Sequence, residues 1–541
     1  MEVARGSKDG SVGPSGSGKS TLLDVLSGRK TVGTLHGDIK IAGAVPTRKF
    51  LRRFTGYVEQ SESLLDMLTV QEMLMYTASL KRPMHETASV VSLGHIPMER
   101  GISGGQAKRV NIGIALVSAP RILFMDEPTS GLDSYTANEV MRVVKRLAGM
   151  GITLVSSIHS PTPFCFDLFD RVLLLLRGSA IYFGPNGKLL ADYFRILCPD
   201  VAGMKEGANL AEWIVDLTTQ GDWSGQAEKF IAAFASSDLK RIADAETTWQ
   251  LRQPSMLSRR DEEDLAVKQT TVTPFWWGLK TLLQYRTLKN YRSAAWLGPR
   301  IGDKLLIAFI IFSAYWSLGD NLSVDNVLNL CAALFMCTIP AGFGAVAYTP
   351  ALVLERPLFV RERNDGLYRV VTYLCAKMLE ELGLALLISL VFSNIVWWAL
   401  ALEGSYLLFW LDYLCALAIG IVLAYFIAAL SPNMVTAAAA LPAYMTANLF
   451  FTGLLLRWDD IPKYWRWLAY INFMRYSWGA LMLNQFGGDR DVQLLGGDTV
   501  LQYYSLSGAD KWVWLGIEFS FFLVFFFLAF VALTLVSHVK R

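Results

Sequence analysis

The chain has 541 residues, which is too long for one compact domain, and 53% of them are hydrophobic. Its formal net charge of +3 is too small to indicate a nucleic-acid partner, and the sequence holds no basic block with interleaved aromatic residues. Residues 1–290 mix charged, glycine and apolar residues as a soluble domain does, whereas long uncharged stretches dominate from about Leu305 onward. The composition therefore predicts a soluble half followed by a membrane half.

A phosphate-binding loop is encoded near the amino end. Residues 13–21 read Gly-Pro-Ser-Gly-Ser-Gly-Lys-Ser-Thr and match the P-loop pattern GxxxxGK[ST]. In this pattern the backbone N–H groups cradle the phosphates, and a helix N-terminus lies behind them. We expect Lys19 to reach the β- and γ-phosphates and Ser20 to ligate Mg²⁺. The nucleotide-binding residues predicted here are Gly13, Ser15, Gly16, Ser17, Gly18, Lys19, Ser20 and Thr21.

A strand followed by two carboxylates is predicted at residues 121–128, which read Arg-Ile-Leu-Phe-Met-Asp-Glu-Pro. In a P-loop enzyme Asp126 would hold Mg²⁺ through water, and Glu127 would polarise the attacking water as general base. The alternative is that these acidic residues only cap a strand, and the upstream Lys19 disfavours it. The predicted cofactors are therefore ATP and Mg²⁺.

Six stretches of the second half are long and apolar enough, or nearly so, to cross a membrane. The first is the weakest, with 15 uncharged residues from 305 to 319, but Arg300 and Lys304 are expected to snorkel and extend its helix back toward Pro299. The predicted spans are residues 299–319, 327–353, 382–402, 407–431, 434–456 and 513–537.

Lysine and arginine gather in alternate loops, and this bias predicts that both termini are cytosolic. Residues 457–511 then form an external loop. The aromatic and cationic residues at 461–467 fit a helix at the membrane interface or an ordinary folded external loop equally well. Asp412 and Glu518 lie near the starts of spans and are expected at headgroup level.

Further short segments complete a set of motifs in a fixed order along the chain. They are Gln60 in Tyr-Val-Glu-Gln, residues 102–109 (Ile-Ser-Gly-Gly-Gln-Ala-Lys-Arg), residues 131–134 (Gly-Leu-Asp-Ser) and residues 157–160 (Ser-Ile-His-Ser). With the P-loop and the acidic pair, this set resembles that of the ATP-binding cassette (ABC) proteins. The soluble half precedes the membrane half, and residues 21–29, 209–213 and 355–369 are similar to the G subfamily, the White and pleiotropic drug resistance transporters.

The resemblance implies an α/β P-loop NTPase domain of the ABC type, followed by an all-α transmembrane domain with six helices. The boundaries that we predict are a cassette at 1–221, a linker at 222–272, an amphipathic connecting helix at 273–294 and a transmembrane domain at 295–541. It further implies that His159 senses the γ-phosphate and that Gln60 contacts Mg²⁺. The other nucleotide contacts that it implies are Asp133 and, acting on the site of a second cassette, Ser103, Gly104, Gly105 and Gln106.

One P-loop and one signature segment in a chain imply, by the same resemblance, that two cassettes pair. The chain is then a half-transporter with an identical or different partner, or a fragment of a longer transporter. Membrane lipid and hydrophobic or amphipathic molecules such as lipids, sterols and xenobiotics are the expected partners, in the plasma membrane or an organelle membrane of a eukaryote. Spans two and five would line the path, with Phe335, Phe343, Asn448, Phe450 and Phe451.

Two features depart from the family pattern. Twelve residues precede Gly13, with no aromatic residue to stack on adenine and no apolar run, so the amino-terminal strand is expected to be missing. Only 42 residues lie between Gln60 and Ser103, which indicates a shortened helical subdomain. Two hypotheses therefore stand: an ATP-driven exporter, and a catalytically weak or inactive half that supports an active partner.

Overall fold

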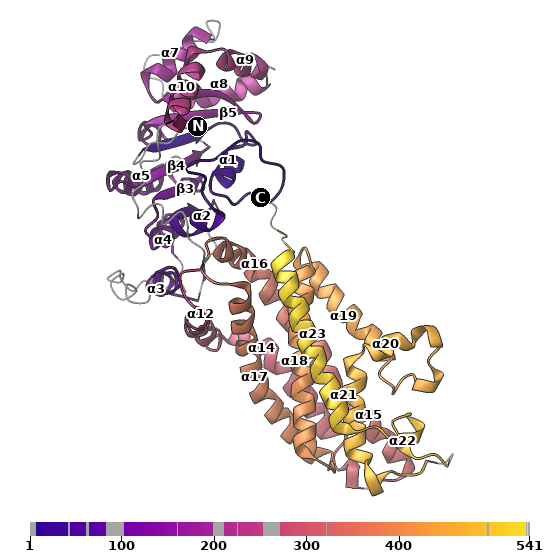
Figure 1. The fold of residues 1–541 in the computed structure, drawn as a ribbon. Helices are drawn as coiled ribbons and strands as arrows, with labels where there is room; N and C mark the ends of the chain where they lie inside the picture. Colours follow the sequence, from indigo (N-terminus) through magenta and orange to yellow (C-terminus); the bar gives the residue numbers. More distant parts are fainter. Residues whose placement is uncertain are drawn as a thin grey trace. The chain divides into compact units, whose positions relative to one another are not determined.

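The computed structural model divides the chain into two compact units (Figure 1). The first comprises residues 1–281 with 360–369 and 539–541, and the second comprises residues 282–359 and 370–538. The residues that the structure describes are 7–41, 44–60, 64–65, 67–82, 102–159, 161–197, 210–223, 226–252, 271–320, 322–494, 497–536 and 538.

The first unit is built on a six-stranded sheet with the order β2-β3-β4-β1-β5-β6. Its strands are β1 (Lys8–Val12), β2 (Thr55–Val58), β3 (Ile122–Asp126), β4 (Thr153–Ile158), β5 (Arg171–Leu176) and β6 (Ser179–Pro185). All neighbours pair in parallel except β5 and β6, which form an antiparallel hairpin. Arg177 and Gly178 have φ values of 47° and 80°, which suit a tight two-residue turn.

Helices cover this sheet and extend from it (Figure 1). They are α1 (Lys19–Leu26), α2 (Arg48–Phe54), α3 (Val70–Lys81), α4 (Gly104–Leu116), α5 (Ser134–Gly149), α6 (Pro163–Asp167), α7 (Lys188–Leu197), α8 (Leu210–Trp223), α9 (Ala227–Ala235) and α10 (Asp238–Arg252). The segment predicted as a linker thus contains α9 and α10, and both pack against β6.

The strand before the P-loop is present, contrary to the sequence expectation. β1 lies in the interior of the sheet, between β4 and β5, and pairs with both. Its sequence is Lys-Asp-Gly-Ser-Val, so backbone hydrogen bonds on both edges, rather than an apolar run, hold it in place. A Cβ on Gly10 would lie 2.9 Å from the Phe169 ring, so the absence of a side chain there makes room for that ring.

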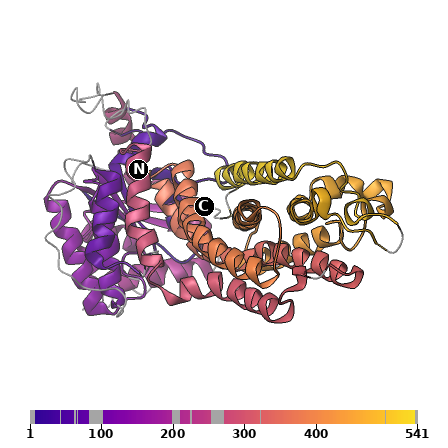
Figure 2. The ribbon, with the colours of Figure 1, turned by 90° about the horizontal axis from the view of Figure 1, so that it is seen from below.

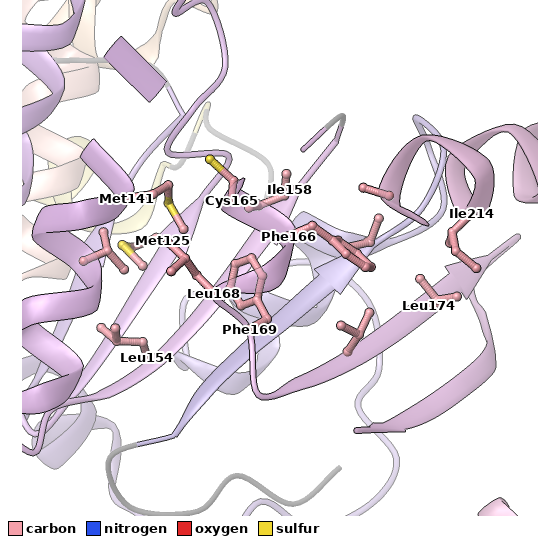
Figure 3. Close-up of a cluster of buried hydrophobic side chains, with 14 of the residues drawn as sticks. Met125, Met141, Leu154, Ile158, Cys165, Phe166, Leu168, Phe169, Leu174 and Ile214 are labelled. Carbon is pink, nitrogen blue, oxygen red and sulfur yellow. The ribbon is translucent and has the colours of Figure 1, made fainter. Parts of the chain in front are cut away.

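The largest apolar cluster of this unit packs on one face of the sheet (Figure 3), and two smaller clusters pack on the other face. Strand β5 reads Arg-Val-Leu-Leu-Leu-Leu, and all five of its aliphatic side chains are buried, as expected for a strand covered on both faces. Because parallel strands end at the same edge of a sheet, the segments that follow β1, β3 and β4 lie near one another. These segments carry the P-loop, Glu127 and His159.

The second unit consists of helices packed side by side (Figures 1 and 2). They are α14 (Ala294–Ala314), α15 (Val324–Phe343), α16 (Thr349–Asn364), α17 (Val370–Ala399), α18 (Tyr406–Leu430), α19 (Met434–Phe450), α20 (Arg466–Tyr470), α21 (Phe473–Phe486), α22 (Val500–Tyr503) and α23 (Lys511–Leu535), with the end of α16 in the first unit. Helix α18 packs against α15, α17, α21 and α23, which places it at the centre.

Four stretches of the described residues are long and apolar enough to cross a membrane: Asn326–Tyr348, Val370–Ala399, Tyr406–Leu430 and Lys511–Leu535. The chain is therefore a membrane protein. The other two predicted spans fall on α14, which carries Arg300, Asp303 and Lys304, and on α19, which has only 17 residues. Helix α17, which contains the third predicted span (382–402), begins at Val370, twelve residues before that span.

A predicted amphipathic helix precedes these spans, and the structure has helix there. It consists of α12 (Phe275–Leu282), a π-helical turn (Leu283–Thr287) and α13 (Leu288–Asn290). Trp276 and Leu288 are more than half exposed, at 75% and 56%. Leu279 and Leu282 of the same segment are buried, at 7% and 2%, and its amphipathic character stays a prediction.

The segment predicted as an external loop is folded. α20 is short and leaves the Trp467 and Tyr470 side chains exposed, at 55% and 56%. α21 instead packs against α15, α18 and α23, and its Trp478 indole donates to the Cys331 carbonyl at 3.2 Å. The sequence reasoning missed α21 because its polar residues, such as Asn484 and Gln485, interrupt the apolar pattern.

Charged residues that the sequence placed near water lie inside the second unit. Arg300 and Lys304 are 3% and 1% exposed, so neither snorkels. Arg300 donates from Nε and Nη2 to the two carboxylate oxygens of Glu381, at 2.9 and 2.7 Å. This two-bond pairing balances the charge that burial would otherwise leave uncompensated.

Asp412 and Glu518 are also buried inside this unit, at 1% and 0% exposure, and the expectation that they lie at headgroup level stays a prediction. The Ser477 hydroxyl of α21 donates to Asp412 at 2.9 Å. α21, which the sequence reasoning missed, therefore supplies a partner for the buried Asp412.

Candidate functional site

The P-loop joins the end of β1 to the start of α1 and turns through glycine residues. Gly16 and Gly18 have φ values of 79° and 100°, in the left-handed region that glycine adopts without a Cβ clash. A Cβ on Gly13 would lie 2.3 Å from the Leu175 carbonyl oxygen. These positions therefore need glycine for conformation or for space, and α1 begins directly behind them with its N-terminal N–H groups free for an anion.

Lys19 is the first residue of α1, and its side chain is 5% exposed. Its ammonium group donates to the carbonyl oxygens of Gly13 and Pro14, at 2.8 and 3.0 Å. Burial lowers the pKa of Lys19, and the nearby carboxylates of Glu127 and Asp126 partly offset that effect. The cation is thus held across the loop, next to the place where the pattern puts the phosphates.

Ser20 and Asp126 come together from α1 and the end of β3. The Ser20 hydroxyl donates to Asp126 Oδ1 at 2.9 Å, and the Ser157 hydroxyl donates to the same oxygen at 2.6 Å. Mg²⁺ in such sites takes one or two carboxylates and keeps several waters and phosphate oxygens. Although the described residues hold no cluster of three His, Cys, Asp or Glu side chains, this hydroxyl–carboxylate pair fits that ion.

Glu127 follows β3 in a left-handed conformation, with a φ of 48°. Its backbone N–H donates to Ser157, to the carbonyl oxygen at 3.2 Å and to Oγ at 3.0 Å. The Gln60 amide donates to Glu127 Oε2 at 2.9 Å. The structure thus brings together two residues that the sequence could place only separately. It also adds Ser157, a polar residue in a buried strand, which anchors Asp126 and Glu127.

Lys108 is a second residue that the sequence reasoning missed. Its side chain is 1% exposed, and its ammonium group donates to the Gln60 carbonyl oxygen at 2.9 Å. Lys108 lies on α4, the helix that begins at the signature segment. This hydrogen bond therefore links α4 to the segment that carries Gln60. The signal available in the sequence was a lysine directly after the signature, in the run Gly-Gly-Gln-Ala-Lys-Arg.

The signature residues form the start of α4. The Ser103 hydroxyl accepts from the Gln106 N–H at 3.3 Å, and the Gln106 side chain accepts from the Ser103 N–H at 2.9 Å, which is a capping box. Gly105 lies against Thr136, where an added Cβ would come within 2.0 Å of Cγ2. Within the described ranges no hydrogen bond joins this segment to the P-loop of the same chain.

Asp133 and His159 are the remaining predicted residues. Asp133 caps α5, and its Oδ2 accepts from the Thr136 N–H at 3.0 Å. That backbone hydrogen bond is the main reason why the pKa of Asp133 is lowered. His159 follows β4 directly and is exposed. Ser15, Gly16 and Thr21 are exposed around the P-loop.

Comparison with known proteins identifies both halves of this architecture. A family model described as "ABC transporter" matches residues 1–130, and one described as "ABC-2 type transporter" matches residues 278–486. The first includes the P-loop, Gln60, the signature and the acidic pair. The second covers the helices from α12 to α21.

Two plant proteins are similar along most of the chain. "ABC transporter G family member 6" of Arabidopsis thaliana is 29% identical, with 88% of this chain and 70% of that protein covered. "Pleiotropic drug resistance protein 1" of Nicotiana tabacum is 31% identical, with 91% of this chain and 36% of that protein covered. The chain spans about a third of the length of several of the curated relatives that it matches.

A solved structure of a nucleotide-free cassette from an ABC transporter is 22% identical and covers 36% of this chain and 86% of its own, with a TM-score of 0.31. The domain pair and the relatives define the class, an ATPase cassette joined to a transporter membrane domain, in which ATP hydrolysis is coupled to transport. The chain is thus an ABC transporter, and the relatives to which it is similar include members of the G family.

Proposed function

We propose that this chain hydrolyses ATP in a dimer and uses it to export hydrophobic or amphipathic molecules across a membrane. The observation that carries the ATPase part is the shared position of Ser20, Asp126, Glu127 and Gln60 at one edge of the sheet. Lys19 stabilises negative charge there, and α1 points its N-terminus at the same place. Mg²⁺, when bound, would neutralise phosphate charge beside Ser20 and Asp126.

Glu127 is the general base in this proposal. Its carboxylate is held by the Gln60 amide, and its backbone is fixed by Ser157, so the group is oriented before a water arrives. Because proton transfer contributes roughly 10²–10⁴-fold to a rate, loss of this carboxylate should abolish most turnover. The same residues in working geometry favour an active cassette over a weak or inactive one.

Dimerisation is proposed because, among the described residues, no hydrogen bond joins the signature to the P-loop of its own chain. Ser103, Gly104 and Gly105 would then complete the nucleotide site of a second cassette, identical or different. Six membrane crossings and cytosolic termini complete the proposal, with α14 and α19 as the two crossings added to the four apolar spans.

Support for the nature of the cargo is limited to composition. Phe335 and Asn448 are buried, at 3% and 1%, so they do not line an open path in this chain, whereas Phe450 is 51% exposed. An apolar lining with few polar groups would suit lipids, sterols or xenobiotics better than ions or sugars.

The test is the vanadate-sensitive ATPase rate of the purified full-length chain in lipid nanodiscs. The Glu127→Gln variant should lower the turnover by about 100-fold or more. Glu139→Gln is the matched control, because Glu139 is paired with Arg142 at the exposed surface of α5, and it should leave the rate within about twofold. Equal rates in the parent and Glu127→Gln would contradict the active-exporter proposal.

A further inference from the structure

A cavity of about 180 Å³ lies in the first unit, beyond the end of α1. A cavity of this size has room for a small polar group. Its lining comes from the turn after α1, from α2 and from two residues of the 360–369 segment that belongs to this unit. The lining residues that matter for its charge and contacts are Arg29, Lys30, Arg48, Arg52, Asn364 and Asp365.

The charges of this lining do not balance. Four of its side chains are cations, Arg29, Lys30, Arg48 and Arg52, whereas Asp365 is its one carboxylate. Arg29 already pairs with Asp365 and, at 3.5 Å, with Glu59. In the described part of the chain, Lys30, Arg48 and Arg52 make no ion pair. Within the described residues, three positive side chains therefore border the cavity without an ion pair, although the Asp365 carboxylate attracts Arg52.

The cations repel one another at short range. Burial lowers the pKa of Arg52, and repulsion from Arg363, Arg48 and Arg29 lowers it further. An anion that enters the cavity stabilises a buried arginine among other cations, because it offsets their repulsion and replaces hydrogen bonds that burial removed. Arg29 is held apart from this role by its two carboxylates and by the Tyr57 ring, which lies 4.3 Å from its guanidinium carbon.

We propose that this cavity is a binding site for a phosphate monoester, held by Arg48, Arg52 and Lys30. A monoester carries close to two negative charges at neutral pH and offers three acceptor oxygens, which suits several cations better than a single carboxylate does. Arginine binds such a group with two parallel hydrogen bonds, and lysine adds a point charge. The site is separate from the P-loop, which lies at the opposite end of α1.

Two sources supply this chemistry, a soluble phosphate ester and the headgroup of an anionic lipid. Glycerol 3-phosphate and phosphatidic acid carry the same phosphate monoester, so they form a matched pair of probes. A ligand in the cavity would touch both the α1 turn and Asn364–Asp365, and would stabilise their arrangement by mass action.

The experiment uses the full-length chain with Lys19→Ala, so that anion binding at the P-loop is weakened. In one arm, glycerol 3-phosphate is titrated at low ionic strength into the chain in phosphatidylcholine nanodiscs, with calorimetry as readout. In the other arm, the melting temperature is compared between nanodiscs of pure phosphatidylcholine and nanodiscs that also contain phosphatidic acid. Arg48→Gln with Arg52→Gln is the test variant, and Lys49→Gln, an exposed neighbour on α2, is the control.

The double variant should weaken binding by about tenfold or more, which corresponds to about 1.4 kcal/mol. Lys49→Gln should change it by less than about twofold. Saturable binding in the first arm assigns a soluble ester, and a melting-temperature rise only in the second arm assigns the lipid; either result supports the site. The proposal is overturned if neither probe binds the parent, or if the double variant keeps its ligand-free melting temperature and binds as tightly as the parent.

Discussion

The two units of this molecule use buried charge in different ways. In the nucleotide site of the cassette, Lys19 lies at the start of α1, and Asp126 and Glu127 lie at the end of β3. They are held mainly by neutral partners such as hydroxyls, an amide and carbonyl oxygens. In the helical unit, buried cations meet carboxylates directly, as Arg300 meets Glu381. The nucleotide site of the cassette therefore leaves its charges available for a ligand, whereas the helical unit neutralises Arg300 internally.

The largest effect should follow from breaking an internal pair of the helical unit. Glu381→Gln keeps the shape of the side chain but leaves the buried Arg300 guanidinium without a counter-charge, which should cost about 3–5 kcal/mol of stability. The measurement is the fraction of monodisperse chain that survives heating in detergent, read by size-exclusion chromatography.

Glu403→Gln is the control for this change. Glu403 meets Arg490 at 3.8 Å with both side chains at least a third exposed, so its loss should cost less than about 1 kcal/mol. Equal survival of the two variants would show that the contrast between the units is wrong.

An intermediate effect is expected in the cassette from Gly105→Ala. The added methyl group would come within 2.0 Å of Thr136 Cγ2, so α4 or α5 must shift, at about 1–3 kcal/mol. Gly104→Ala is the matched control, since its nearest atom, Leu132 Cδ2, would lie 3.6 Å away. Thermal unfolding of the nucleotide-free chain should therefore separate two adjacent glycines of one motif, and indistinguishable unfolding curves would exclude the close contact.

The smallest effect concerns a single exposed charge. The pKa of Asp133 is lowered in the folded chain by the backbone hydrogen bond from Thr136, so ionised Asp133 stabilises the start of α5. This contribution is fully present above the unfolded pKa of about 3.9 and is lost as the pH falls through the lower folded pKa.

Asp133→Asn keeps a capping oxygen but removes the charge, and hydrogen exchange at the Thr136 amide reads the result. Exchange should be faster in the variant at neutral pH, and the two chains should converge under acid conditions. A difference that persists unchanged in acid would assign the effect to geometry rather than to charge.

Short motifs made the cassette predictable, because each acts through neighbouring residues. The P-loop, the acidic pair and the signature were located from sequence, and residues 13–21 do join a strand to a helix. The strand β1 was missed because Gly10 and Asp9 break the apolar run, and only pairing with β4 and β5 makes them a strand. Lys108 was missed because its partner, the Gln60 carbonyl, is 48 residues away along the chain.

The helical unit shows the opposite balance. Apolar length located the four long helices, since the membrane imposes that length whatever the neighbours are. Arg300, Asp412 and Glu518 were placed near water because a single sequence shows the cost of burying a charge but not the partner that offsets it. α21 was not predicted for the same reason, because its polar residues make hydrogen bonds within the unit that a single sequence does not show.

The π-helical turn at Leu283–Thr287 has a consequence for the helix that contains it. A π turn accommodates one more residue than a regular turn, and residues in an α-helix are spaced by about 100° around its axis. Loss or gain of that extra residue re-phases everything on one side of the turn against the other. Phe275–Leu282 would then be rotated about the helix axis relative to Leu288–Asn290. The hydrogen-bond pattern of this one turn therefore sets which side chains the first segment presents.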